Sequence, residues 1–203
     1  MDEFQLYVAL WRRAELDGVS VRYEDDRSES GTNGYFDPHR YDTPSDPEIV
    51  IVRAWCTPPG NEPRRESDAP PPLAQPDIPE ELITLAHEFG HGRSFLTDTK
   101  RWLEYDDVSA RLQIVQREAS FTAISRSLVG TAANDAIRRV ILETLDDNER
   151  ALIIDEEMRA WGIARETLAE AGYDGWARFQ VREQRGLHFH RWRLGIAEAL
   201  PDA

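Results

Sequence analysis

The pattern with the clearest chemistry in the sequence is formed by two histidines and a glutamate. His87, Glu88 and His91 stand in the segment LITLAHEFGHG, with the histidines four residues apart. On a helix, side chains at this spacing project from one face, so both imidazoles can reach one metal ion. Glu88 follows the first histidine directly, where its carboxylate can take a proton from a water that the metal has made acidic. The spacing therefore predicts two zinc ligands and a catalytic base.

A catalytic zinc ion usually has three protein ligands, so a third donor is needed. Glu157, in the segment IIDEEMRAWG, has apolar residues one helical turn before it and one turn after it. A carboxylate on an apolar stripe is costly unless it is paired or coordinated, and zinc would provide that compensation. We therefore expect Glu157 to be the third ligand, and an ion pair with an arginine is the alternative explanation for it.

Other donors remain open for the third position. Glu156 lies closer to the polar edge of the same helix, and Glu118 stands 27 residues after His91 (118 − 91) between apolar neighbours. His188 and His190 are two residues apart, so on a helix they diverge by about 200° and at most one of them faces the site.

Four further side chains are candidates for stabilising the negative charge that develops on a substrate during hydrolysis. They are Tyr35, His39, Tyr105 and His188. The sequence does not rank them.

The motif lies in a segment with strong helix signals. Asp77 can cap a helix over residues 78–95, Pro79 suits its first turn, and Glu80 completes a capping box. Gly90 costs such a helix about 1 kcal/mol relative to alanine, which suggests that another backbone approaches closely there.

The remaining elements divide into a sheet part and a helical part. An amphipathic helix over Asp2–Leu16 precedes three segments of strand character, at Val19–Tyr23, Gly34–Phe36 and Glu48–Trp55. Helical periodicity returns in four segments after the motif, namely Val108–Ile124, Ala132–Leu145, Asn148–Ala171 and Gly175–Ala199. We predict a single α+β domain over residues 1–203, with the small mixed sheet in about 1–77 and a helical bundle in about 78–199.

Two segments near the expected sheet bear on substrate access. The strand Glu48–Trp55 is predicted at the sheet edge, where an extended peptide could add as another strand. Residues 56–75, rich in proline and charge, are predicted to form an extended surface loop that could cover the cleft. Cys56 at its start is interpreted as a core residue rather than as a zinc ligand.

Composition limits the partners and the compartment. The chain has 24 basic and 38 acidic residues and a formal charge of −14, which argues against nucleic acid or an anionic membrane as the main partner. The single cysteine cannot form an intramolecular disulfide, so a disulfide framework is not expected. The sequence contains no apolar segment long enough to suggest export or membrane insertion. A cytoplasmic location is therefore expected.

The chain resembles the gluzincin metallopeptidases, and in particular the ImmA/IrrE type. The shared residues are His87, Glu88 and His91 in LAHEFGHG and the distant pair Glu157 and Ala160. The resemblance implies a zincin-like fold in which His87, His91 and Glu157 bind zinc and Glu88 is the base. Two features differ from that family: the offset of 66 residues from His91 to Glu157 (157 − 91), and Trp161 where asparagine is often found.

The resemblance implies a zinc-dependent endopeptidase that hydrolyses a cytosolic protein and has a possible regulatory protein partner. Two other functions fit the same residues. One is a protein-binding module that keeps the zincin fold without catalysis, which the intact Glu88 disfavours. The other is a zinc hydrolase of a non-peptide amide, which the same water activation permits.

Overall fold

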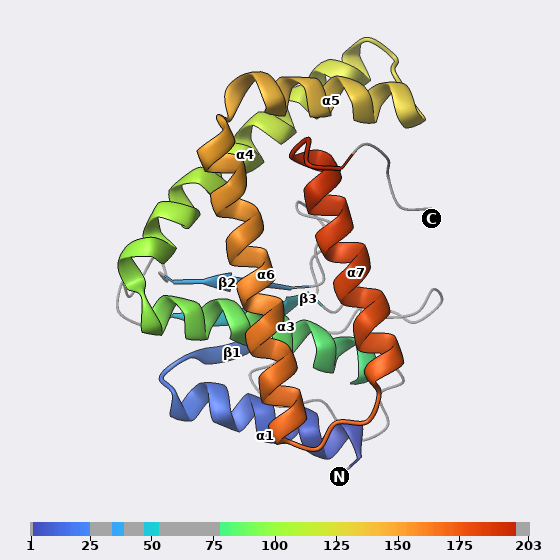
Figure 1. The fold of residues 1–203 in the computed structure, drawn as a ribbon. Helices are drawn as coiled ribbons and strands as arrows, with labels where there is room; N and C mark the ends of the chain where they lie inside the picture. Colours follow the sequence, from blue (N-terminus) through green and yellow to red (C-terminus); the bar gives the residue numbers. More distant parts are fainter. Residues whose placement is uncertain (1, 25–33, 39–46, 53–77, 198–203) are drawn as a thin grey trace. The chain divides into compact units, whose positions relative to one another are not determined.

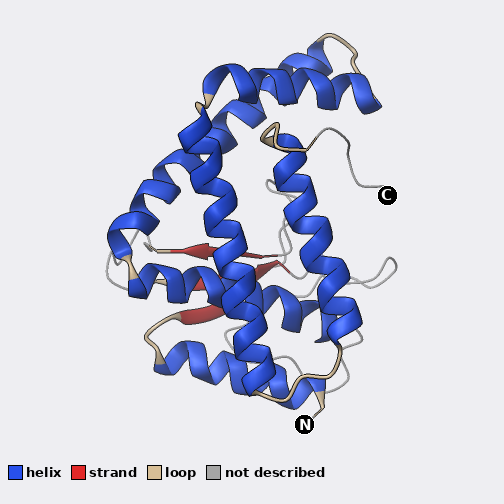
Figure 2. Cartoon of the chain, in the orientation of Figure 1, coloured by secondary structure: helices blue, strands red, loops and turns tan. Residues whose placement is uncertain are grey.

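The protein is described by a computed structural model that covers residues 2–24, 34–38, 47–52 and 78–197. This part of the chain is mostly helical, with one small mixed sheet, as expected of an α+β protein (Figure 2). Its elements are α1 (Glu3–Leu16), β1 (Ser20–Glu24), β2 (Gly34–Asp37), β3 (Glu48–Val52), α3 (Ile78–Thr97), α4 (Thr99–Ser125), α5 (Gly130–Thr144), α6 (Asp147–Glu170) and α7 (Trp176–Arg193) (Figure 1). The Pro-rich segment 56–75 with Cys56, the proposed cap Asp77 and the candidate His39 lie outside the described residues.

The chain divides into two compact units. Unit 1 consists of Met1–Thr97 and Arg159–Phe179, and unit 2 consists of Asp98–Met158 and Gln180–Ala203. Helices α6 and α7 therefore contribute residues to both units. None of the helices in the described ranges is both long and apolar enough to cross a membrane.

Unit 1 holds the sheet, whose strand order is β1-β3-β2. β3 pairs in parallel with β1, where Val21 lies opposite Ile49, and antiparallel with β2, where Gly34 lies opposite Ile51. The prediction that Glu48–Trp55 forms the sheet edge is therefore wrong, because β3 is the central strand. Its run of Ile49, Val50 and Ile51 is fully buried, as expected of a strand with a neighbour on each side.

Helices α1 and α3 pack beside this sheet. α3 contacts β2, β3 and α1, and α1 contacts β1, so the two helices lie next to each other (Figure 1). A buried chain of hydroxyl and carboxyl groups links them: the hydroxyls of Tyr7 and Tyr23 are 2.7 Å apart, and Tyr23 donates to Oε2 of Glu81 at 3.4 Å. One polar network thus joins α1, β1 and α3 inside the core.

Unit 2 contains α4, α5, the first half of α6 and most of α7. α4 packs against α5, and Arg111 of α4 forms an ion pair with Glu149 of α6. Arg138 of α5 donates from Nε to the carbonyl of Trp192 at 2.9 Å, which ties α5 to the end of α7.

Two predicted helix limits are wrong. α4 begins at Thr99 rather than Val108, because the Asp98 side chain accepts a bond from the backbone N–H of Arg101 at 3.2 Å and so caps an earlier, more polar turn. α7 ends at Arg193 rather than near Ala199, because Gly195 adopts a φ of 75°, which breaks the helix.

The buried hydroxyl chain generates a stability prediction. Tyr7→Phe removes one hydroxyl and leaves Tyr23 without that partner, so we expect the free energy of unfolding to fall by about 1 kcal/mol. Urea denaturation followed by circular dichroism measures it. Tyr173→Phe is the matched control, because the Tyr173 hydroxyl is buried with no hydrogen-bond partner among the described residues. Equal losses in both variants would show that the network contributes nothing specific.

Candidate metal centre

Helix α3 carries the His-Glu-x-x-His motif. Its apolar residues pack against the sheet and α1, and Glu88 and His91 are buried at 7% and 5% exposure. The rings of His87 and His91 lie one turn apart, with centroids 4.8 Å from each other and planes at 77°. The helical spacing therefore places both imidazoles on one face, as the sequence predicts.

The second half of α6 lies directly against α3 at Gly90. A Cβ atom built on Gly90 would be 2.2 Å from the carbonyl oxygen of Ala160, far inside any normal contact. Only glycine permits this approach, which confirms the expectation that another backbone comes close to Gly90. Ala160 is itself fully buried, so the two helices touch through two small residues.

Trp161, the residue after Ala160, fixes one of the histidines. Its ring stacks on the imidazole of His87 with a centroid distance of 4.2 Å and an interplanar angle of 27°. Phe179 supports the tryptophan in turn, edge to face, at 5.5 Å. The histidine ring is thereby held in one orientation by packing.

Glu157 stands one turn before Trp161 on the unbroken helix α6. The side chains of His87, His91 and Glu157 form a cluster that could hold a metal ion, with one ligand atom from each lying within 4.8 Å of the others. Two imidazoles and a carboxylate are a donor set that suits zinc, and three ligands leave a fourth position open for water. The residues thus fit the metal that the sequence predicts.

The carboxylate of Glu157 also has neighbours on both of its oxygens. The hydroxyl of Tyr105 donates to Oε1 at 3.3 Å, and Nε2 of His190 lies 3.7 Å from Oε2. Glu157 is buried at 7% exposure, so these contacts reduce the cost of placing its charge away from water.

The other candidates for the third ligand lie elsewhere. Glu118 is exposed on α4, and Glu156 is fully buried beside Glu157 but does not belong to the cluster. His188 is half-buried on α7 and is likewise outside the cluster, while His190 contacts Glu157. Among the residues proposed to stabilise developing charge, Tyr35 lies on β2 and Tyr105 reaches Glu157.

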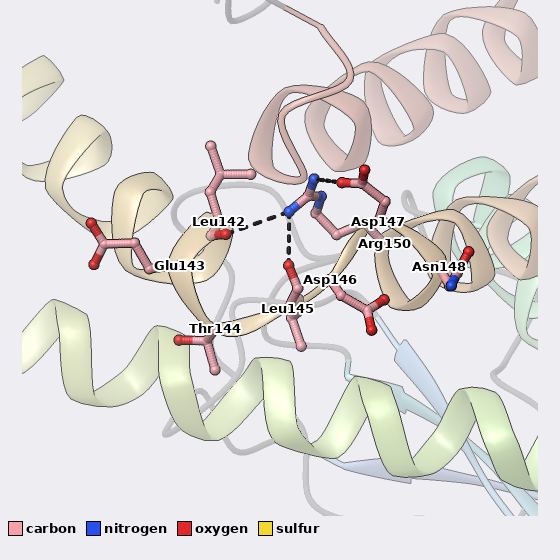
Figure 3. Close-up of a pocket in the computed structure, with 8 residues that line it drawn as sticks. All are labelled: Leu142, Glu143, Thr144, Leu145, Asp146, Asp147, Asn148 and Arg150. Atoms are coloured by element: carbon pink, nitrogen blue, oxygen red, sulfur yellow. Dashed lines mark hydrogen bonds and ion pairs between the residues drawn. The ribbon is translucent and has the colours of Figure 1, made fainter.

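A separate pocket in unit 2 has a structural explanation. It lies where α5 ends and α6 begins, and Figure 3 shows its eight lining residues, from Leu142 to Arg150. Arg150 donates to the carbonyls of Leu145 at 2.7 Å and Leu142 at 3.5 Å, and it pairs with Asp147. These bonds satisfy the carbonyls at the end of α5, so the pocket is a helix junction closed by an arginine.

Comparisons of the chain with protein families, with curated proteins and with solved structures give no match. The interpretation of the site therefore depends on its own geometry.

Two contributions to the site do not follow from the sequence analysis. In the sequence Trp161 is only a departure from the ImmA/IrrE pattern, and its stacking on His87 depends on how α3 and α6 pack. Arg193 is the second: its Nη2 lies 2.9 Å from Nδ1 of His190, and its position three residues after His190 in the segment HFHRWR places the two on one helical face. The spacing alone could have identified that pair.

The contact at Gly90 predicts that replacing glycine by alanine destabilises the protein at position 90 and stabilises it at position 162. Gly90→Ala places a methyl group against the Ala160 carbonyl, so we expect it to lower the free energy of unfolding by about 1–3 kcal/mol. Gly162→Ala on α6 is the matched control: its Cβ would meet nothing within 4 Å among the described residues. Helix propensity alone should then stabilise that variant by about 0.5–1 kcal/mol. Thermal denaturation compares the two, and stabilisation by Gly90→Ala would contradict the observed helix approach.

Proposed function

We propose that this protein is a zinc-dependent peptidase with a zincin-like fold, in which Glu88 is the catalytic base. The observation that carries the proposal is the cluster of His87, His91 and Glu157, with Glu88 on the same helix as the two histidines. A bound zinc ion would supply an acidified water and a positive charge beside the substrate carbonyl.

The surroundings of Glu88 suit a base. Its side chain is buried, and a Cβ built on Gly34 of β2 would lie 3.4 Å from its Cγ. Burial removes competing solvent, and the neighbouring strand limits the positions that the carboxylate can adopt. In the proposed reaction Glu88 accepts a proton from the attacking water and passes it to the leaving amine.

The same strand supports a polypeptide substrate. β2 lies at an edge of the sheet in the described part of the chain and begins beside Glu88. An extended peptide that paired with β2 would run past the base through main-chain hydrogen bonds. We propose β2, rather than the strand at Glu48, as the edge that receives substrate.

The wider proposal follows the resemblance to the ImmA/IrrE type. It assigns a cytosolic protein as substrate and allows for a regulatory protein partner. The donor set and Glu88 support hydrolysis, and the edge strand supports a peptide over a smaller amide.

The first test is the amount of zinc bound per chain in protein purified without added metal. We expect about one equivalent in the wild type and a loss in His87→Ala and Glu157→Ala, because a catalytic zinc relies on three protein ligands. Glu118→Ala is the control, since that exposed carboxylate lies outside the cluster. Elemental analysis measures zinc, and a metal-free wild type would contradict the proposal.

The second test separates catalysis from binding. Glu88→Gln keeps the shape of the side chain but removes its ability to accept a proton, so we expect zinc to remain bound while hydrolysis falls by at least about 10²-fold. Cleavage is followed by mass spectrometry on a peptide library and, in parallel, on non-peptide amides. Turnover unchanged by Glu88→Gln would eliminate Glu88 as the base, and turnover of the amides alone would replace the peptidase with an amidase.

A further inference from the structure

Three polar side chains of unit 2 lie around Glu157. Tyr105 comes from α4, and His190 and Arg193 come from α7. The hydroxyl of Tyr105 donates to Oε1 of Glu157 at 3.3 Å, while Nε2 of His190 lies 3.7 Å from Oε2. Each carboxylate oxygen therefore has its own neighbour, from a different helix.

The contacts of His190 determine which of its nitrogens carries the proton. Nη2 of Arg193 lies 2.9 Å from Nδ1 of His190. A guanidinium has only donors, so Nδ1 must accept in this bond. The proton of the neutral imidazole is then on Nε2, the nitrogen that faces Glu157. His190 is thus set to direct an N–H at the carboxylate.

Arg193 is held in place from its other side. Its Nη1 donates to Oε1 of Gln116 on α4 at 2.9 Å. Burial lowers the pKa of the Arg193 guanidinium, and the negative charge of Glu157 opposes that effect. A guanidinium keeps its proton in proteins, so Arg193 supplies a positive charge that compensates the buried carboxylate.

We propose that Tyr105, His190 and Arg193 are positioning residues that fix the carboxylate of Glu157 in the orientation needed to bind the metal. Arg193, anchored on Gln116, sets the tautomer of His190, and His190 and Tyr105 each restrain one oxygen of Glu157. The inference rests on the proposed metal centre. It adds to that centre a set of residues which act on the metal through its carboxylate ligand.

The consequence of this arrangement is measurable as metal affinity. A carboxylate that can rotate freely must lose that freedom when it binds an ion, whereas a restrained carboxylate has already lost it. Residues that orient a metal ligand typically change metal affinity by about 10–100-fold when they are replaced. The effect should therefore appear in the dissociation constant for zinc, independently of any substrate.

The experiment measures zinc affinity by competition with a chromophoric chelator, using the full chain. We expect Tyr105→Phe and His190→Leu each to weaken binding by about tenfold or more. His190→Gln should recover part of the affinity, because its amide can again direct an N–H toward Glu157. Tyr173→Phe is the control, since it removes a buried hydroxyl with no hydrogen-bond partner among the described residues.

A purely structural role gives a different result. In that case the melting temperature of the metal-free variants would fall, and His190→Gln would bind zinc no better than His190→Leu; this outcome overturns the inference. Wild-type affinity in both Tyr105→Phe and His190→Leu also overturns it and leaves the metal centre intact. A wild type that binds no zinc removes the metal centre itself, and the positioning role with it.

Discussion

The close approach of two backbones, at Gly90 on α3 and Ala160 on α6, is the constraint on which the site depends. With a Cβ-to-oxygen distance of 2.2 Å for any residue larger than glycine, no side chain can stand between these helices. The contact fixes the distance between the two helices, and this distance determines which neighbouring side chains can meet. Trp161 can stack on His87 only because α6 lies this close to α3. Gly90 has no reactive side chain, yet the close approach that it allows positions the side chains around the candidate metal site.

Buried acidity is the main cost that the structure has to offset. The chain carries an excess of 14 negative charges, yet Glu88, Glu156 and Glu157 are all withdrawn from water. Carboxylates are rarely buried unless hydrogen bonds, cations or a metal compensate them. Around Glu157 the described residues provide a hydroxyl, an imidazole and a guanidinium. Packing alone does not explain three polar groups around one glutamate, and these groups distinguish Glu157 from the exposed Glu118.

The sequence predicts the elements and the motif well, and their packing less well. The His-Glu-x-x-His helix, the three strands and the later helices follow from periodicity, caps and glycines, because those signals are local. The place of β3 in the sheet did not follow, since strand order depends on contacts between distant segments, and a run such as Ile49-Val50-Ile51 indicates burial without naming its neighbours. The spacing in HFHRWR pairs Arg193 with His190, but the contacts of Arg193 with Gln116 and of His190 with Glu157 appear only when α4, α6 and α7 lie together. Zinc, peptidase activity and kinship with the ImmA/IrrE type stay predictions.

Unit 1 is built from two stretches that lie far apart in the sequence, and this has a consequence for synthesis. Its first part ends at Thr97, and its second begins only at Arg159. When the first stretch has left the ribosome, the strands of the sheet and helices α1 and α3 have been made, but the residues of α6 that lie against α3 have not. Gly90 and its apolar neighbours stay uncovered until more than sixty further residues have emerged. Contacts this distant along the chain close slowly, so the nascent protein passes through a stage in which chaperones have a surface to bind.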